Sequence, residues 1–125
     1  MTVRELTNSA LSVIGLYGGD NPPCDTADLD GRAIMLINVL LGELATLDCR
    51  IKREPPKIYS VSGFSDNLQT CDIISSSVLP FGLAALFALG EDDNLYLTLQ
   101  SRYNAAKANA LALGRAKAEP IREVY

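Results

Sequence analysis

The chain has 125 residues, enough for one domain with a hydrophobic core, and its 48% hydrophobic and 21% charged residues are typical of a folded globular protein. A net charge of −4 argues against a protein whose whole surface binds nucleic acid, because neutralising phosphates requires an excess of lysine and arginine. Histidine is absent, which excludes histidine-based catalytic triads and mixed cysteine–histidine zinc sites.

A first helix is predicted from Thr2 to Ile14. Thr2 and Glu5 have the spacing of a capping box, in which each side chain accepts a hydrogen bond from the other residue's backbone N–H. Gly15, followed by Gly18 and Gly19, is expected to end the helix. One face of the helix is apolar and consists of Val3, Leu6, Ala10 and Val13.

A longer second helix is predicted to begin at Asp25 or Thr26. Asp28 and Asp30 would lie in its first turn, where negative charge complements the helix dipole. Apolar residues recur every three or four positions, which predicts a buried stripe. This stripe consists of Ala33, Ile37, Leu40, Leu44 and Leu47.

Residues 50–67 are the least regular part of the sequence, and they predict an irregular loop or a short hairpin. The segment begins with a basic stretch around two prolines, formed by Arg50, Lys52, Arg53 and Lys57. A helical turn is predicted over Leu68–Ile74.

A helix is predicted over Val78–Leu89, with Ser76 or Ser77 as its cap and Pro80 in its first turn. Proline is tolerated there because the N–H that it lacks would have no partner inside the helix. Its residues are apolar on nearly every side, which is typical of a helix at the centre of a core. Gly90 is expected to end it.

The last helix is predicted to begin at Asp92 or Asp93 and to run to about Lys117. Its apolar stripe consists of Leu95, Leu99, Tyr103, Ala106, Ala110 and Leu113. Proline at position 120 stops the helix, so residues 119–125 are expected to form an extended arm. We therefore predict an all-α fold, a small bundle of about four helices over residues 1–118 followed by this arm.

Charge is distributed in zones along the chain. The net charge is −5 over residues 1–49, +3 over 50–57, −5 over 58–99 and +3 over 100–125. Alternating zones suit head-to-tail contact between copies, although solvated charges that only keep the protein soluble are the simpler interpretation.

Sites for catalysis, cofactors or metals are not predicted. The acidic groups Asp28/Asp30 and Glu91/Asp92/Asp93 lie at helix starts, where carboxylates serve as caps. The longest apolar stretch, Ile73–Gly90, is interrupted by three serines, Pro80 and Gly82, so we expect no membrane partner.

The basic stretch at residues 50–57 has two interpretations. With Tyr59 beside it, it could contact nucleic acid, and the protein would then be a small helical regulatory or nucleic-acid-binding module. A solvated loop, or a loop between subunits or against an acidic partner, is the alternative.

Several segments together resemble the head–tail connector proteins of tailed bacteriophages and prophages, also called head completion or portal adaptor proteins. The segments are "ALSVIGL" at 10–16, "LINVLLGEL" at 36–44, "GFSDNL" at 63–68, "VLPFGLAALFAL" at 78–89 and "GEDDNLYLTLQSRYNAA" at 90–106. The resemblance covers almost the whole chain.

The resemblance implies a structural virion protein without catalytic residues, which forms a ring of about twelve copies beneath the portal. The ring would extend the DNA channel, bind the portal and the next connector or tail protein, and let double-stranded DNA pass without reading its sequence. Such a protein is found at the head–tail interface of the virion, and in the host cytoplasm during assembly.

Within that family the C-terminal arm often docks on the portal. The matching residues of this chain are Arg115, Lys117, Ile121, Arg122 and Tyr125. An acidic channel lining would let DNA slide. The candidates for that lining are Asp28, Asp30, Glu91, Asp92 and Asp93.

Overall fold

The computed structural model describes residues 1–18 and 26–118, with the backbone alone at residues 18, 26–30 and 115–118. Its described part is all-α, as predicted, and contains no strand. The elements are α1 (Val3–Gly18), α2 (Thr26–Lys52), a π-helical segment η1 (Ile74–Val78), α3 (Leu79–Ala88) and α4 (Asp93–Ala118).

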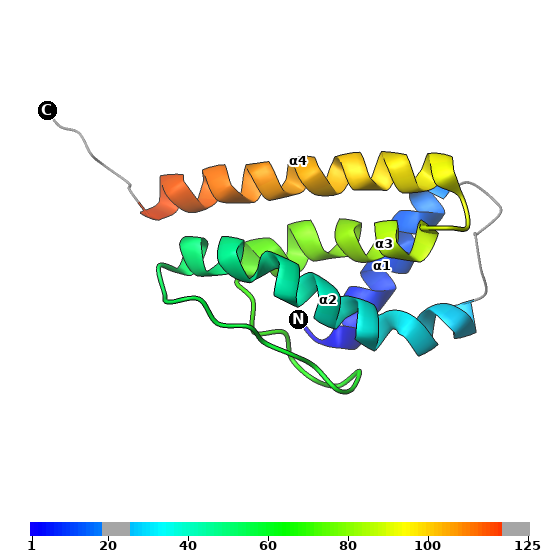
Figure 1. Ribbon diagram of the computed structural model, residues 1–125, viewed down its shortest axis with the longest axis horizontal. Helices are drawn as coiled ribbons and strands as arrows, with labels where there is room; N and C mark the ends of the chain where they lie inside the picture. The colour runs from blue at the N-terminus through cyan, green and yellow to red at the C-terminus, as the bar shows by residue number, and fades with distance from the viewer. Residues whose placement is uncertain (19–25, 119–125) are drawn as a thin grey trace, which may run out of the picture.

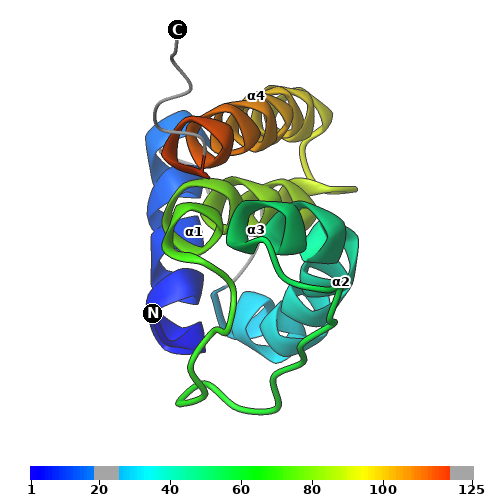
Figure 2. The same ribbon diagram turned by 90° about the vertical axis from the view of Figure 1, so that its left-hand side faces the viewer.

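The helix α3 is the centre of the bundle. Viewed from one end, it lies between α1 and α2, with α4 packed over it (Figure 2). The helices α2 and α4 run in the same direction, α3 runs in the opposite direction, and α1 crosses them steeply (Figure 1). Because α3 contacts all three other helices, it buries eight of its ten residues.

The capping box at the start of α1 is confirmed. The backbone N–H of Thr2 donates to Oε1 of Glu5 at 3.0 Å, and the N–H of Glu5 donates to Oγ1 of Thr2 at 3.2 Å. These bonds lower the pKa of Glu5, since they favour its charged form. The cap therefore weakens only as the pH falls through the lowered pKa of that carboxyl group.

The end of α1 differs from the prediction. The helix continues through Gly15 to Gly18 instead of stopping at Ile14. A glycine in a helix costs only about 1 kcal/mol relative to alanine. Contacts of Tyr17 in the added turn with the Phe81 ring and with Arg102 offset this cost, so local propensity alone placed the boundary too early.

Pro80 lies in the first turn of α3, as predicted, but the chain is already helical before it. The N–H of Leu79 bonds to the carbonyl of Ile74, five residues back, in the wider π geometry. In a regular α-helix the proline ring would collide with the carbonyl four residues earlier, at Ser76. The wider turn gives the ring room and lets the helix pass through the proline.

Serine capping of α3 was predicted wrongly. No side chain caps this helix, because η1 precedes it and supplies backbone partners instead. The hydroxyl of Ser76 donates to the carbonyl of Asp72 at 2.6 Å. Ser75 is buried, and its hydroxyl lies 2.7 Å from that of Thr70.

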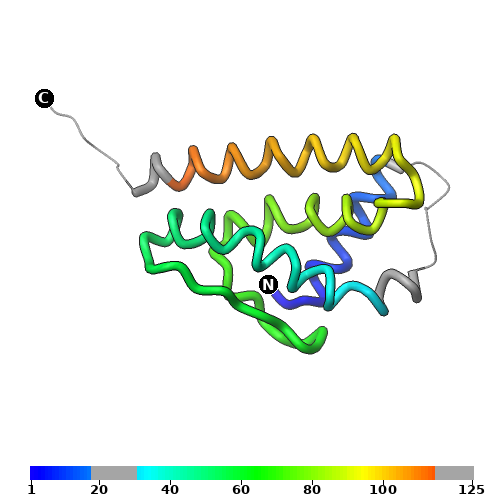
Figure 3. Tube along the Cα trace, viewed as in Figure 1, coloured from blue at the N-terminus to red at the C-terminus, as the bar shows by residue number. Residues whose placement is uncertain are grey.

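The segment between α2 and η1 is an irregular loop, not a hairpin. Figure 3 shows its path along the side of the bundle. The side-chain amide of Asn38 on α2 holds this loop through both backbone groups of Val61. It accepts from the N–H of Val61 at 2.8 Å and donates to the carbonyl of Val61 at 2.9 Å. A side chain thus replaces the neighbouring strand that a hairpin would need.

The turn at residues 63–68 binds the start of α1. The N–H groups of Val3 and Arg4 donate to the carbonyls of Asp66 and Phe64, at 2.9 and 3.0 Å. These N–H groups have no partner inside the helix, so the loop satisfies them. The Arg4 guanidinium also lies 4.0 Å from the centre of the Phe64 ring.

The helix α4 begins and ends close to the predicted positions. Asp92 caps it by accepting from the N–H of Leu95 at 3.1 Å, and Gly90, at φ +84°, ends the preceding helix. The predicted stripe fails at Leu113, which is 59% exposed. Near its end α4 packs against Ile51 of α2, and the buried residue there is Gly114 instead of Leu113.

Candidate interaction surfaces

The predicted basic loop is in part a helix end. Arg50 and Lys52 belong to the last turn of α2, where cations complement the helix dipole, and they were wrongly assigned to the irregular segment. Arg53 follows with a left-handed backbone at φ +60°, and the N–H of Glu54 donates to the carbonyl of Cys49 at 3.1 Å. This is a Schellman-type helix end with arginine in the position that glycine usually takes.

Lys52 fastens the loop to α2. Its ammonium lies 3.1 Å from Oδ2 of Asp48 and donates to the carbonyl of Gln69 at 2.6 Å. Asp48 is 3% exposed, and its other oxygen accepts from the N–H of Cys71 at 2.8 Å. One buried carboxylate therefore holds both the lysine and the backbone that leads into η1, which gives Lys52 a structural role.

The pH range over which the Lys52–Asp48 ion pair stabilises the fold follows from the pKa of Lys52. Burial lowers the pKa of Lys52, but the hydrogen bond and the charge of Asp48 outweigh burial and hold this pKa above the usual 10.5. A group with a raised pKa contributes its full stability below the unfolded-state value and loses it as the pH rises through the folded-state value. The ion pair therefore persists throughout the neutral range.

Replacing Asp48 with alanine is expected to lower the free energy of unfolding by about 2 kcal/mol, because a buried N–H and an ammonium lose their acceptor. Urea unfolding measures this loss, which should be equal at pH 7 and pH 9. Glu54→Ala is the matched control: Glu54 is exposed, and a change within about 0.5 kcal/mol is expected. Equal stability of the two variants would show that Asp48 does not anchor the loop.

The two lysines of this region lie near Tyr59. The ammonium groups of Lys52 and Lys57 lie 4.8 and 5.3 Å from the centre of its ring. Arg50, Arg53 and Lys57 are all exposed. The exposed positive charge predicted for this region therefore comes from three arginine and lysine residues, while Lys52 is held inside by Asp48.

The acidic residues predicted to line the channel and the basic residues that end α2 lie at opposite ends of the bundle. The helix α2 starts with Asp28 and Asp30 in its first two turns, at the end where the turn carrying Glu91–Asp93 joins α3 to α4 (Figure 1). At the other end α2 finishes with Arg50 and Lys52. The predicted channel-lining residues are thus brought to one end, although the side chains of Asp28 and Asp30 lie outside the described residues.

The arm falls mostly outside the described residues. Arg115 and Lys117 lie in the last turn of α4, where the backbone alone is described. Ile121, Arg122 and Tyr125 belong to residues 119–125, which are not described. Their assignment to the arm remains a prediction.

A polar clamp joins α2 to α4. The hydroxyl of Tyr103 donates to Oε1 of Glu43 at 3.0 Å, and the ammonium of Lys107 lies 3.6 Å from the same oxygen. Burial, followed by the hydrogen bond and the charge of Glu43, raises the pKa of Tyr103 far above its usual value of 10. The hydroxyl therefore remains a donor at any physiological pH.

Between Asn94 and Gly114, the side of α4 opposite its buried stripe carries no charge. We call it the outward face of α4; it consists of Leu97, Ser101, Asn104, Ala105, Ala108 and Ala112, all exposed. The charged residues between Asn94 and Gly114 are Arg102 and Lys107, and both lie on its flanks. Arg102 lies 5.7 Å from the centre of the Tyr17 ring, and Lys107 pairs with Glu43.

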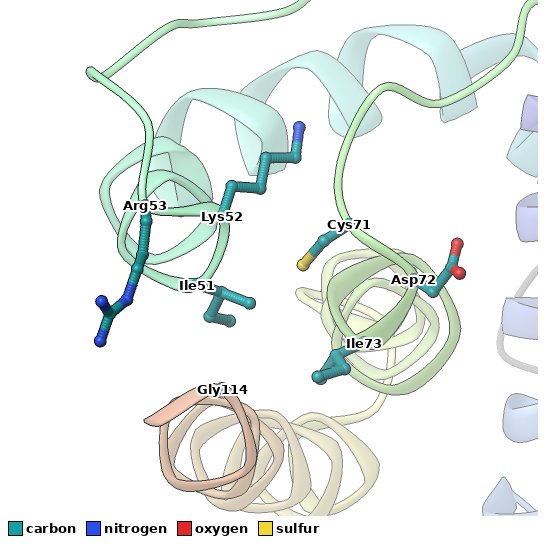
Figure 4. A pocket seen from close by; sticks show the side chains of 7 residues that line it. All are labelled: Ile51, Lys52, Arg53, Cys71, Asp72, Ile73 and Gly114. Atoms are coloured by element: carbon teal, nitrogen blue, oxygen red, sulfur yellow. The ribbon is translucent and has the colours of Figure 1, made fainter. Parts of the chain in front are cut away.

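A cavity of about 470 Å³ lies where the end of α2, residues 71–73 and the last part of α4 meet. Figure 4 shows Ile51, Cys71 and Ile73 pointing toward one another across it, while the charged ends of Lys52 and Asp72 point away. Gly114 lines it on α4, and a Cβ there would lie 2.8 Å from Cγ1 of Ile51. Burial raises the pKa of the Cys71 thiol, which favours its neutral form.

Two other kinds of feature, a membrane-spanning helix and a metal-binding cluster, are absent from the described residues. No helix there is both long and apolar enough to cross a bilayer. No group of three or more cysteine, aspartate or glutamate side chains is arranged to hold a metal ion in that part of the chain.

Comparisons with models of known protein families, with characterised proteins and with solved structures found no match to this chain. The class of protein that the structure itself defines is a small all-α bundle with a long C-terminal helix.

Proposed function

We propose that this chain is a structural connector protein of a tailed bacteriophage or prophage, which forms a ring beneath the portal and joins head to tail. The observation that carries the proposal is the outward face of α4. A solvated helix face usually carries charged residues. A face that is exposed yet uncharged over several turns has the composition of a subunit interface, whose centre is depleted of charge.

A second exposed apolar surface lies on α2. Met35 and Val39 are 63% and 54% exposed and one turn apart, so they project from the same side of that helix. Contact between this pair on one copy and the small side chains of α4 on the next would join two different surfaces. Such head-to-tail contacts close into rings when the rotation between copies permits.

The opposite charges at the two ends of the bundle favour a protein that joins two different partners. In a ring all subunits point the same way, so one side would carry Glu91, Asp92 and Asp93, and the other would carry Arg50 and Arg53. Each side can then bind a different neighbour, the portal or the next connector. Acidic residues facing the channel would let DNA pass without being held.

Self-association tests the proposal. We expect Ala108→Glu, which places a charge in the middle of the outward face, to abolish rings seen by negative-stain microscopy and sedimentation, alone or with purified portal. Asn8→Glu, the same charge change at an exposed position on α1, should leave them intact. A wild-type protein that stays monomeric even with portal rings would contradict the proposal.

The second candidate function is a nucleic-acid-binding module that uses the exposed cations Arg50, Arg53 and Lys57. Binding to duplex DNA with a steep salt dependence, lost on charge reversal at Arg50 and Arg53, would favour it over the connector. Absence of binding at low salt would remove it. Lys52 is left unchanged in this test, because its pairing with Asp48 would confound the result.

A further inference from the structure

The cavity between Ile51, Cys71 and Ile73 has the properties of a binding site for an aliphatic side chain. Its centre is apolar, and its volume of about 470 Å³ lies within the range of pockets that take small ligands or several side chains. Gly114 keeps it open toward α4, since any larger side chain there would collide with Ile51. Leaving such a site empty would keep apolar surface in contact with water.

The end of α4 brings one segment of the chain to this cavity. Gly114 lies on its wall, and Ala118, the last helical residue, is four residues further, about 6 Å along the axis. Pro120 cannot continue the helix, so the chain must leave the helix axis close to the cavity. Three residues reach at most about 10 Å, enough for Ile121 to return from Ala118 to the level of Gly114.

We propose that the cavity is the docking site of the chain's own C-terminal segment, residues 119–125, with the side chain of Ile121 between Ile51 and Ile73. The short connection gives the segment an effective concentration that no separate peptide would match. This inference does not depend on the connector proposal. If both hold, the cavity and the portal compete for the same arm.

The Cys71 thiol reports occupancy of the cavity that it lines. The experiment uses the chain with Cys24→Ser and Cys49→Ser, so that one thiol remains, and follows its alkylation by iodoacetamide at pH 8.5. A docked segment shields the thiol. We therefore expect a chain that ends at Ala118 to react at least fivefold faster than the full chain.

Point variants keep the segment and change only its contact. Ile121→Ser is expected to react as fast as the truncated chain, and Arg122→Ser as slowly as the full chain. The control for the fold keeps Cys49 as the only thiol; it lies outside the cavity and should react equally in the full and truncated chains. Equal Cys71 rates in the full and truncated chains would overturn the proposal.

A disulfide identifies which copy supplies the segment. In the same single-thiol background, Ile121→Cys should form a disulfide with Cys71 under mild oxidation, and the product should run as a monomer on a non-reducing gel. A disulfide-linked dimer would mean that the segment comes from another copy, and a failure to cross-link would mean that Ile121 does not reach the cavity. Either result would overturn the proposal as stated.

Discussion

Replacing Phe87 with alanine is expected to lower the free energy of unfolding by about 3–5 kcal/mol. Among the side chains that the structure describes, Phe87 is the largest with no exposed surface, and it lies on α3, which packs against the three other helices. Removing its ring leaves a cavity that no single neighbour can fill. Because domains of this size are stable by only about 5–15 kcal/mol, the variant should be close to unfolding at 37 °C.

Urea unfolding followed by circular dichroism measures this loss. Phe81→Ala is the matched control on the same helix: Phe81 is half-buried and contacts Tyr17 edge to face, with ring centres 6.4 Å apart. We expect its loss to be less than half as large. Equal losses at the two positions would show that α3 is not the centre of the core.

Gly82→Val is expected to destabilise the protein by about 3 kcal/mol, near the upper end for an overpacked core. A Cβ at this position would lie 2.8 Å from Cε1 of Tyr103 and 3.1 Å from Cδ2 of Leu40. The Tyr103 ring cannot move aside cheaply, because its hydroxyl is tied to Glu43. Glycine is therefore required where α3 packs against Leu40 of α2 and Tyr103 of α4.

The control is a glycine inside α2 that has open space around it. A Cβ at Gly42 would meet nothing within 4 Å, so Gly42→Ala should raise stability by about 0.5–1 kcal/mol through helix propensity alone. Thermal and urea unfolding of both variants compare the two effects. A stable Gly82→Val variant would show that α3 and α4 are further apart than described here.

Features that depend on neighbouring residues could be predicted from the sequence. The capping box of Thr2 and Glu5 and the cap at Asp92 lie where short-range hydrogen-bond rules place them. The central position of α3 followed from the lack of any polar side, and its residues are buried as expected. Each of these predictions rests on residues within about one turn of helix.

Features that depend on distant partners could not be predicted in this way. Nothing near Asn38 indicates that its amide holds Val61, 23 residues away, and nothing near Asp48 indicates its bond to Cys71. The π geometry before Pro80 also escaped prediction, because a serine before a proline suggests a cap. The aspartate four residues before Lys52 was the sequence signal that this lysine could be paired within its own helix.

The candidate surfaces were predicted less well than the fold. The basic stretch was recognised, but its division between a helix end and a loop depends on tertiary contacts of Lys52. The outward face of α4 became visible only when Arg102 and Lys107 were placed against Tyr17 and Glu43. Sequence periodicity identifies the buried side of a helix, but it does not show which partners the charged side chains beside that stripe contact.

The hydrogen bonds between the start of α1 and residues 64–68 have a consequence for biosynthesis. The residues of α1 leave the ribosome before their partners in the loop, which are made about 60 residues later, and α3, against which α1 packs, is made later still. At about 5–20 residues per second, the delay is roughly 3–12 s. During that time the apolar side of α1 has no place to bind, so a nascent chain paused before residue 64 should be a substrate for chaperones.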